Sequence, residues 1–208
     1  MKKATSCAVL CAAGLSSRMG TSNKLLMPYD TGTIISHALD QLLAASFSEI
    51  IVVLGHEHRK VMSSIQHYDE KITVVVNKAF ETGHLSTIQT GIRHVNPGIS
   101  AIAICLSDMP LLTGPLYDEI LHFFEHEVIH DQPGIVRPLC GKRPGHPVII
   151  SSDLAEEFLH LDPNEKARSF IRKRKEILRP YPSCHPGYFT DIDTPKDFDS
   201  FIKRFGQE

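Results

Sequence analysis

The sequence predicts a single α/β domain in which helices flank a twisted, mostly parallel sheet. Two observations lead to this prediction. Short apolar runs alternate along the chain with longer amphipathic runs, and this β-α-β-α order is typical of a parallel sheet. The apolar runs are almost free of polar residues, as expected for strands that are covered on both faces.

The first part of the chain supplies the regular alternation. Four strands are predicted, at residues 6–12, 49–54, 72–76 and 101–106. Four helices are predicted between and after them, roughly at residues 33–46, 57–67, 84–94 and 114–130. Ligands of such sheets bind beyond the carboxyl ends of the strands. The loop after the first strand lies at such an end.

After residue 131 the pattern changes, because prolines divide the chain into short pieces. Further strands are predicted at residues 134–138, 147–150, 176–181 and 188–191. Further helices are predicted near residues 152–160, 164–174 and 195–205. No linker or repeat separates this part from the rest. We therefore expect one domain over residues 1–208, in which residues 132–208 cover the open end of the sheet.

Composition excludes several classes of protein. The chain has 208 residues, of which 42% are hydrophobic and 22% charged, which is typical of a globular domain. The formal net charge of −2 gives no global basic field for nucleic acid. No apolar run approaches the ~20 residues of a membrane span. The amino-terminal residues lack the apolar region of a signal peptide, so we expect a cytoplasmic protein with no membrane partner.

The cysteines indicate no disulfide framework. There are five, an odd number, and no Cys-x-x-Cys pair occurs. Three lie in the apolar runs, where a thiol behaves as a small hydrophobic group: Cys7, Cys11 and Cys105. Cys140 and Cys184 lie in sequence typical of loops, and we expect both to be unpaired.

The segment 10–24 (Leu-Cys-Ala-Ala-Gly-Leu-Ser-Ser-Arg-Met-Gly-Thr-Ser-Asn-Lys) carries the strongest functional signal. The apolar strand stops at Gly14 and continues as a loop of small residues. Such a loop exposes backbone N–H groups to a phosphate, and Arg18 and Lys24 add the positive charge that a polyphosphate needs. The segment is neither a Walker loop nor a dinucleotide fingerprint. An ordinary turn after a strand explains the glycine but not the two cations.

Two acidic segments are candidates for metal binding. Asp108 follows the strand 101–106, so its carboxylate points toward the same edge as the glycine loop, and hard cations such as Mg²⁺ prefer carboxylate and phosphate oxygens. Capping of the next turn is the alternative for this Asp-x-Pro. Asp191 and Asp193 alternate on a predicted strand and would share one face. Thr194 then caps a helix that has Pro195 at its first position.

Residues 77–91 follow the strand 72–76 and open a helix. Gly83 and Ser86 stand at its start, where N–H groups face an anion or a base. A plain capped helix explains these two residues but leaves Asn77 unexplained.

One motif competes with this interpretation. Residues 126–130 (His-Glu-Val-Ile-His) match the H-E-x-x-H pattern of zinc proteases. On a helix, however, His126 and His130 both lie away from the apolar face, and no third ligand is evident. His122 extends the same stripe, which favours weak adventitious metal binding over a protease site.

Together these segments resemble the molybdenum-cofactor nucleotidyltransferases, the MobA-like family, from residue 10 to residue 197. Segment 10–24 matches the family signature Leu-Ala-Ala-Gly-x-Ser-x-Arg-Met-Gly-x-x-Lys, with Cys11 in place of an alanine. Residues 106–110 correspond to a family Gly-Asp-x-Pro, here with Ser107 for the glycine. Residues 77–91, the Gly-His-Pro of residues 145–147 and the Asp-Ile-Asp-Thr-Pro of residues 191–195 complete five matches in order.

The resemblance implies a Rossmann-like fold, with nucleotide bound by residues 1–131 and acceptor by residues 132–208. It implies catalytic roles for Arg18, Lys24 and Asp108, and a Mg²⁺ site at Asp108 and Asp193, with Asp191 as the less certain partner. The nucleotide contacts that it implies are Ala12, Ala13, Gly14, Ser16, Ser17, Asn77, Gly83 and Ser86. On the acceptor side it implies His146 and Arg143; for His146, a rigid loop position beside two prolines is an equal alternative.

Ala13-Gly14 favours cytidylyl or uridylyl transfer, because guanylyl transferases of this family usually carry Gly-Gly there. The resemblance thus implies a CTP-dependent cytidylyltransferase that acts on molybdopterin-type cofactor and supplies hydroxylases of the xanthine dehydrogenase type, with transient contact to an apo-hydroxylase. Residues 161–168 keep only Ala167-Arg168 of a family Gly-Asp-x-Gly-Ala-Arg stretch, which leaves the acceptor open. GTP or UTP as donor, a sugar phosphate or methylerythritol phosphate as acceptor, and a non-catalytic accessory protein for cofactor insertion are the alternatives.

Overall fold

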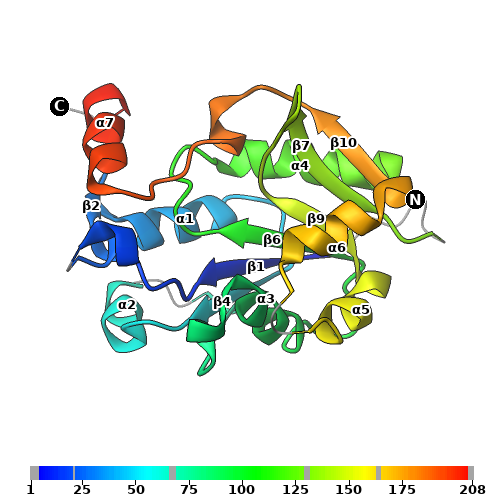
Figure 1. The fold of residues 1–208 in the computed structure, drawn as a ribbon, viewed down its shortest axis with the longest axis horizontal. Helices are drawn as coiled ribbons and strands as arrows, with labels where there is room; N and C mark the ends of the chain where they lie inside the picture. Colours follow the sequence, from blue (N-terminus) through cyan, green and yellow to red (C-terminus); the bar gives the residue numbers. More distant parts are fainter. Residues whose placement is uncertain (1–4, 21, 66–68, 129–131, 163–164, 206–208) are drawn as a thin grey trace.

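A central sheet organises the chain and places the first strand near its middle (Figure 1). The computed structural model describes residues 5–20, 22–65, 69–128, 132–162 and 165–205. The strand order is β10-β7-β9-β6-β1-β4-β5, and β8 pairs with β7. These strands are β1 (Ser6–Ala12), β4 (Glu49–Leu54), β5 (Ile72–Val76), β6 (Ala101–Leu106), β7 (Ile135–Cys140), β8 (Arg143–Pro144), β9 (Val148–Ser151) and β10 (Leu178–Pro182).

The pairing confirms the predicted, mostly parallel sheet. β1 pairs in parallel with β4 and with β6, β4 with β5, and β7 with β10. β9 is antiparallel to both β6 and β7. The first four predicted strands have the predicted bounds, and β1 is buried along its whole length. A small hairpin of β2 (Pro28–Tyr29) and β3 (Gly32–Thr33) was not predicted.

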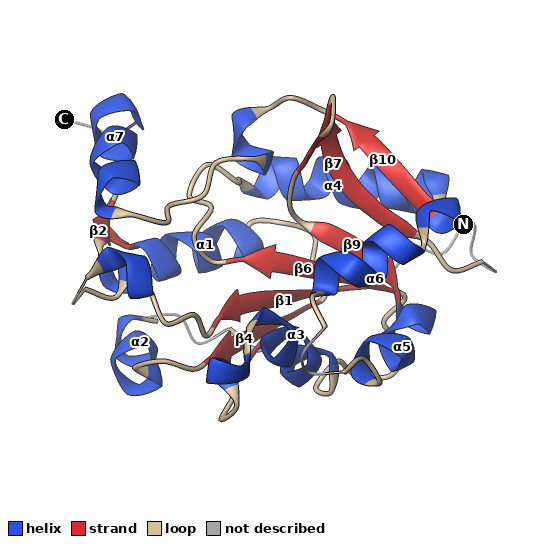
Figure 2. Ribbon diagram, in the orientation of Figure 1, coloured by secondary structure: helices blue, strands red, loops and turns tan. Residues whose placement is uncertain are grey.

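Helices cover both faces of the sheet (Figure 2). One face packs against α1 (Ile34–Leu43), α2 (His58–Ser64) and α4 (Gly114–Glu127), and α7 (Pro195–Phe205) joins this core through Phe201. The other face packs against α3 (His84–Ile92), α5 (Ala155–Leu159) and α6 (Ala167–Lys173). Short 3₁₀ turns are η1 (Ser17–Met19), η2 (Lys24–Leu26), η3 (Phe80–Thr82), η4 (Ser152–Leu154), η5 (Lys175–Ile177) and η6 (Pro186–Tyr188).

Close packing fixes α3 on the strand that carries the glycine loop. A Cβ at Gly91 of α3 would lie 2.2 Å from Val9 Cγ1 of β1, so only glycine allows this approach. The first turn of α3 is thereby held beside the end of β1. This packing sets the position of the helix start at the carboxyl edge of the sheet.

Local capping accounts for two helix starts. The Thr33 hydroxyl accepts from the N–H of Ser36, and the Ser36 hydroxyl accepts from the N–H of Thr33, which begins α1. Thr194 and Asp197 form the same reciprocal pair at α7. The prediction that Thr194 caps a helix beginning at Pro195 is therefore confirmed.

The prediction of a strand at residues 188–191 is wrong. Pro186 begins the turn η6, in which the ring of His185 accepts a hydrogen bond from the N–H of Gly187. The chain then runs without regular structure to α7. The two carboxylates of Asp191 and Asp193 are consequently carried by a loop and not by one face of a strand. The predicted helix at residues 152–160 is divided into η4 and α5.

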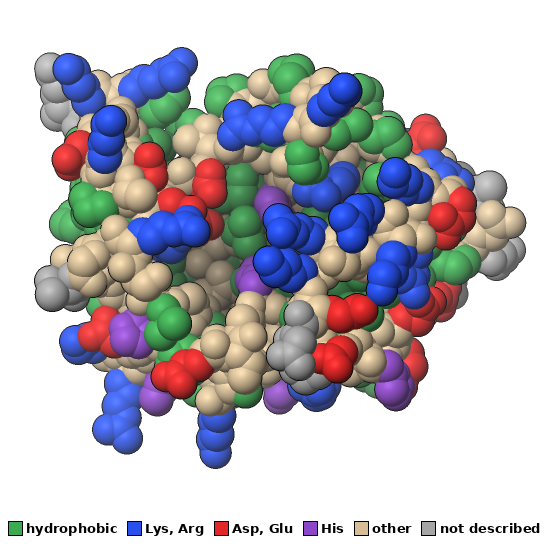
Figure 3. Space-filling model, viewed as in Figure 1, with side chains coloured by type: hydrophobic (Ala, Val, Ile, Leu, Met, Phe, Trp, Pro, Cys, Tyr) green, Lys and Arg blue, Asp and Glu red, His purple; other side chains and the backbone are tan. Residues whose placement is uncertain are grey.

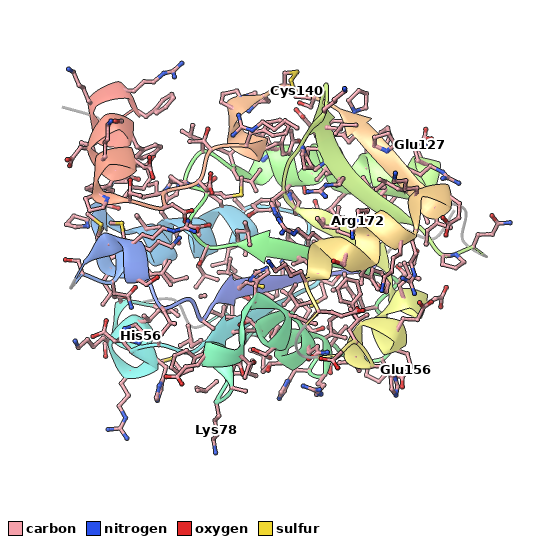
Figure 4. The ribbon with its side chains drawn as sticks, in the orientation of Figure 1. His56, Lys78, Glu127, Cys140, Glu156 and Arg172 are labelled. Atoms are coloured by element: carbon pink, nitrogen blue, oxygen red, sulfur yellow. A yellow bond between two sulfur atoms is a disulfide. The ribbon has the colours of Figure 1, made fainter. Side chains whose placement is uncertain are left out.

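The expectation of unpaired cysteines is wrong for Cys140 and Cys184, which form a disulfide with a Cα–Cα distance of 4.9 Å (Figure 4). β7 and β10 are parallel neighbours in which Leu139 is paired with Pro182, so Cys140 at the end of β7 lies close to Cys184, which follows β10. The sequence does not show this pairing, because 44 positions separate the two thiols. Cys7, Cys11 and Cys105 are free and buried, as predicted.

The first two residues of the H-E-x-x-H segment, His126 and Glu127, end α4. His122 and His126 have ring centroids 5.3 Å apart on that helix, whereas His130 lies outside the described residues. In the described part of the chain, no group of three His, Cys, Asp or Glu side chains is arranged to hold a metal. Among the described residues, no helix has both the length and the apolar character needed to cross a membrane.

Candidate active site

The carboxyl edge of the sheet gathers the segments that the sequence analysis singled out. The loop after β1 and Asp108 after β6 lie at neighbouring strand ends, because β1 and β6 pair in parallel. The backbone N–H of Ile192 donates to the carbonyl of Asp108 over 3.0 Å. This bond brings the loop with Asp191 and Asp193 to the same edge.

The glycine-rich loop is open to solvent but anchored at defined points. Gly14 is exposed, and a Cβ there would meet no atom within 4 Å, so the loop backbone is accessible to a ligand. Met19 is buried and fixes the loop to the core. The Ser16 hydroxyl accepts from the N–H of Lys24 over 3.3 Å, which closes the loop on itself. Ser16 adopts a left-handed backbone with φ of 51°.

A cavity of about 580 Å³ lies against this loop, and we call it the loop cavity. Five of the predicted nucleotide contacts line it: Ala13, Gly14, Ser16, Ser17 and Gly83. Arg18, Lys24 and Asp108 line it as well. Ala12 is buried in β1 and is not among the lining residues. Phe80 and His84, which sequence reasoning missed, complete one wall at the start of α3.

Two cations and two carboxylates form one ionic network at the boundary of the cavity. Lys24 Nζ contacts Asp108 Oδ2, lies 3.2 Å from Asp193 Oδ1 and donates to the carbonyl of Ile192 over 3.1 Å. Arg18 reaches the other oxygen of Asp193 over 2.7 Å. Burial alone lowers the pKa of Lys24, but Asp108 and then Asp193 outweigh it, and the net shift is upward. Lys24 is therefore a protonated cation between the carboxylates.

The second oxygen of Asp108 is available for another ligand. Asp108 Oδ1 is buried and has no hydrogen-bond partner. A buried carboxylate oxygen without a partner costs free energy, and a hard cation or a donor group would remove that cost. Ser107 stands where the resembled family has glycine, and its hydroxyl donates to the Cys11 carbonyl over 2.8 Å. This bond ties the ends of β1 and β6 together beneath the site.

Asn77 and Ser86 occupy a buried position behind the loop cavity. Asn77 Nδ2 donates to Ser86 Oγ over 2.9 Å and to Thr87 Oγ1 over 3.2 Å, while Asn77 Oδ1 accepts from the N–H of Ala79. Neither Asn77 nor Ser86 is among the residues that line the loop cavity. In this structure both side chains shape the turn that carries Gly83.

A second cavity, of about 720 Å³, adjoins the first, and we call it the side cavity. Gly83, His84, Leu106 and Asp108 line both cavities, so the two meet at Asp108. Asp191 and Asp193 also line the side cavity. In Figure 3, the hollow in the middle of the face has acidic side chains next to Lys or Arg side chains on one side, and a group of Lys and Arg side chains on the other. Burial, followed by the charge of Asp108, raises the pKa of Asp191.

Of the two predicted acceptor residues, the structure brings only His146 to the side cavity. Burial, followed by the charge of Arg137, lowers the pKa of His146 to about 4, so its ring is neutral near pH 7. Arg143 is not among the lining residues; it donates to the Phe189 carbonyl over 2.5 Å and lies over the Phe189 ring. Arg137, Lys166 and Arg168 line the cavity instead.

Sequence reasoning missed Arg137 because it lies inside a strand, where a charged residue is normally read as surface. Its neighbours in β7 are the buried Val136 and the buried Pro138. An arginine within such a run could have indicated a functional position, because the charged group of a side chain on a buried strand must reach water or a polar partner.

Comparisons with known proteins identify relatives over the whole fold. The model of the "MobA-like NTP transferase domain" family matches residues 8–177. The molybdenum cofactor cytidylyltransferase of Escherichia coli (strain K12) is 25% identical over 199 residues, which cover 95% of each chain. The nicotine blue oxidoreductase of Paenarthrobacter nicotinovorans is 24% identical, over 89% of this chain and 91% of the relative.

Solved structures share the fold at lower identity. The crystal structure of Rv0371c from Mycobacterium tuberculosis H37Rv superposes with a TM-score of 0.80 at 22% identity, over 98% of this chain and 100% of that one. A second structure of that protein, in complex with manganese, gives a TM-score of 0.75 at 21% identity, over 96% and 98%.

Proposed function

This chain belongs to the MobA-like NTP transferase domain family, and from that membership we propose that it transfers the cytidylyl group of CTP to a molybdopterin-type cofactor and releases pyrophosphate. One observation carries the proposal: the loop cavity and the side cavity meet at Asp108. A nucleotide in the first and a phosphorylated acceptor in the second would bring their phosphates together there. The name of the E. coli relative supports the choice of CTP and of the acceptor.

The glycine-rich loop is proposed to hold the triphosphate. Gly14, Ser16 and Ser17 line the loop cavity, and their small side chains would let phosphate oxygens approach the backbone N–H groups of the loop. Arg18 is exposed at the cavity mouth, where its guanidinium can leave Asp193 for a phosphate at little cost, since exposed ion pairs are weak. Asn77 and Ser86 would act on the nucleotide through the position of Gly83.

Asp108 and Asp193 fit a hard divalent cation. The buried Asp108 Oδ1 has no hydrogen-bond partner. Asp193 lies near Asp108, because both carboxylates contact Lys24. Because the described residues offer no group of three protein ligands, phosphate oxygens would complete the set, as is usual for Mg²⁺. The manganese complex of Rv0371c, a protein of the same fold, is consistent with a divalent ion. When bound, the ion would withdraw electron density from the phosphates and neutralise charge.

The reaction needs little covalent chemistry from the protein. The acceptor's terminal phosphate attacks the α-phosphorus of CTP in line, one P–O bond forms, and the bond to pyrophosphate breaks. No general base is required, because a phosphate monoester is already ionised near neutral pH. Lys24 keeps its proton and places a positive charge beside the phosphates, so positioning and charge neutralisation supply the rate enhancement.

The acceptor side is proposed to use His146 directly and Arg143 indirectly. His146 lines the side cavity as a neutral ring that can hydrogen-bond a pterin or a phosphate. Arg143 holds the Phe189 carbonyl, two residues before Asp191, and would position the acidic loop. The cytosine dinucleotide form made in this way would be handed to an apo-hydroxylase of the xanthine dehydrogenase type.

The test is to incubate the purified protein with Mg²⁺, molybdenum cofactor and, separately, CTP, GTP, UTP or ATP, and to measure pyrophosphate release. Release with CTP alone is the expected result. Release with GTP or UTP would keep the mechanism and overturn the choice of base. Absence of release with all four would contradict the proposal and direct attention to another phosphorylated acceptor or to a non-catalytic accessory role.

A further inference from the structure

Positive charge without a protein counter-charge gathers on one wall of the side cavity. Arg137, Lys166 and Arg168 line this wall, and within the described ranges none of the three forms an ion pair with an acidic side chain. Glu165 also lines the cavity, but its carboxylate lies 3.0 Å from Lys173. By contrast, Lys24, which lines the loop cavity, is neutralised by Asp108 and Asp193 at the opposite end of the side cavity. The unpaired charge is thus confined to the wall formed by β7 and the start of α6.

Arg137 is the central member of this group. Its Nη2 donates to the Gly145 carbonyl over 3.1 Å, and its Nε is buried with no partner. Burial lowers the pKa of this guanidinium, and no carboxylate acts in the opposite direction. A half-buried cation with an unsatisfied donor costs free energy in the empty protein. An anion that enters the cavity would remove that cost.

His146 adds a second unsatisfied atom beside Arg137. Its Nδ1 is buried and has no hydrogen-bond partner, and the ring contributes no positive charge near pH 7. Arg137 on β7 and His146 in the loop before β9 line the same cavity, and each has one buried polar atom without a partner, Nε and Nδ1 respectively. A polar group of a ligand could supply the hydrogen bonds that the protein does not provide to these two atoms.

The lining of the rest of the cavity indicates the chemical character of the molecule that would fill it. Carboxylates occupy the end at Asp108, and the cations occupy the wall of β7 and α6. The surface between them is largely apolar and is formed by Leu85, Ile88, Ile104, Val148, Phe158 and Ile171. A ligand whose reacting phosphate lies at Asp108 would lay an apolar or aromatic middle on this surface and present its far end to the cations.

We propose that Arg137, Lys166 and Arg168 form an oxyanion site for a second anionic group of the acceptor, separate from the phosphate that attacks CTP. This assignment rests on the proposed function, because it takes the attacking phosphate to lie at Asp108. It adds to the proposed acceptor the requirement for a second anionic group besides the attacking phosphate. The second group is a carboxylate or another oxyanion that accepts the two parallel N–H bonds of a guanidinium.

The test measures binding of small oxyanions to the full chain, with CTP present at saturation so that the loop cavity is occupied, and with no metal. Inorganic phosphate and malonate are titrated separately, and the Nε–H resonance of Arg137 is followed by NMR. We expect a saturable shift of that resonance. An unmoved resonance with both anions would overturn the proposal, and this measurement needs no variant that must fold. The anion that binds more tightly assigns the second group to the phosphate or the carboxylate class.

Substitution gives a second, independent readout by calorimetry. We expect Arg137→Gln to weaken the tighter-binding anion by at least about tenfold, since it removes charge-assisted hydrogen bonds. Arg179→Gln is the matched control, because Arg179 lies on the neighbouring strand β10 and does not line the side cavity. This variant should bind the anion with the same affinity as the natural chain. Equal weakening in both variants would show a general effect of charge and would contradict a site.

Failure of this inference and failure of the proposed function can be told apart. Anion binding at Arg137 requires no turnover. Binding without CTP-dependent pyrophosphate release would keep the oxyanion site and refute the proposed reaction. Release of pyrophosphate without anion binding at Arg137 would keep the proposed reaction and refute the oxyanion site.

Discussion

Asp108 is the side chain on which the two cavities converge, and each of its oxygens has a different environment. One contacts Lys24, and the other is buried without a partner. A residue placed in this way can bind a cation on one side while it holds a lysine on the other. The proposed catalytic roles of Asp108, Lys24 and Arg18 lead to separable predictions.

Asp108→Asn should reduce turnover by at least roughly 1000-fold, because the neutral amide loses the charge that holds the metal beside the phosphates. CTP should still bind at low magnesium, since the glycine loop is unchanged. Steady-state kinetics and CTP titration test the two statements. Asp153→Asn, at an exposed carboxylate of η4, should behave as the natural chain. Equal turnover of the Asp108 variant would refute the metal role.

Lys24→Met should strengthen binding of Mn²⁺ in the absence of nucleotide by about tenfold, because a positive charge close to the ion is removed. The same variant should weaken binding of the triphosphate. Titration of Mn²⁺ by electron paramagnetic resonance measures the first effect and calorimetry with CTP the second. If Mn²⁺ bound no better than before, Lys24 would not compete with the ion for Asp108 and Asp193.

His146 predicts a pH dependence of stability. Its pKa is lowered from 6.5 to about 4 in the folded chain, so the folded state binds fewer protons than the unfolded state between these values. The contribution of His146 to the free energy of unfolding is therefore complete above about pH 6.5 and falls as the pH drops toward 4. Urea unfolding at pH 7 and pH 4.5 should show a smaller loss for His146→Gln than for the natural chain. His160→Gln, at an exposed ring, should leave the loss unchanged.

At this scale the sequence predicted the residues that follow strands and missed those inside them. Arg18, Lys24 and Asp108 were accessible to sequence reasoning because each lies in a short motif directly after an apolar run. Arg137 was not, because its role depends on which face of β7 meets the cavity. Arg143 is the opposite case, because it was predicted on the acceptor side but does not line the side cavity. It stands beside the Gly-His-Pro motif, yet its guanidinium binds the Phe189 carbonyl.

Among the elements, the segment from β10 to α7 has the greatest effect on the site, since it carries Asp191 and Asp193. Contacts with several other elements hold it in place. The disulfide joins Cys184 to the end of β7, the Tyr188 hydroxyl donates to the Leu116 carbonyl over 2.7 Å, and Ile192 binds the carbonyl of Asp108. The position of the acidic loop therefore depends on β7 and α4 as well as on its own sequence.

Reduction of the Cys140–Cys184 disulfide should lower the free energy of unfolding by about 2–4 kcal/mol, because the unfolded chain regains the freedom of a loop of 44 residues. Cys184 is exposed, so a thiol reductant can reach the bond. Urea unfolding with and without reductant measures the change. The variant Cys140→Ala/Cys184→Ala should be insensitive to reductant. A natural chain equally insensitive would contradict a stabilising crosslink.

Prediction at the level of elements succeeded where apolar runs are continuous. The four strands 6–12, 49–54, 72–76 and 101–106 were predicted to the residue, because each is a nearly uninterrupted apolar run with clear ends. β1, β4 and nearly all of β6 are buried, as predicted for strands covered on both faces, whereas the edge strand β5 leaves Thr73 and Val76 exposed. The predicted strand at 188–191 failed because its apolar residues are buried in a turn, where Tyr188 and Phe189 pack into the core without pairing. The disulfide depended on the pairing of β7 with β10, which no local pattern encodes.

The whole molecule combines two halves in one sheet. The strands β1, β4, β5 and β6 form the parallel half that carries the glycine loop, and the half with β7 to β10 adds Arg137 and Val148 to the lining of the side cavity. Because β9 joins β6 to β7, both halves belong to one continuous sheet. The order of the elements predicted the parallel half, but it did not predict that β7, β9 and β10 extend the same sheet. The opposite charges at the two ends of the side cavity also emerge only when the chain is folded.

The central claim is that the two cavities bring a triphosphate and a phosphorylated acceptor together for attack at the α-phosphorus. The most direct measurement follows CTP labelled at either the α- or the γ-phosphorus during incubation with Mg²⁺ and molybdenum cofactor. We predict that the α-label becomes part of the acceptor while the γ-label appears only in pyrophosphate, in equal amounts. Appearance of the γ-label in the acceptor or in inorganic phosphate, with CDP as the other product, would contradict nucleotidyl transfer.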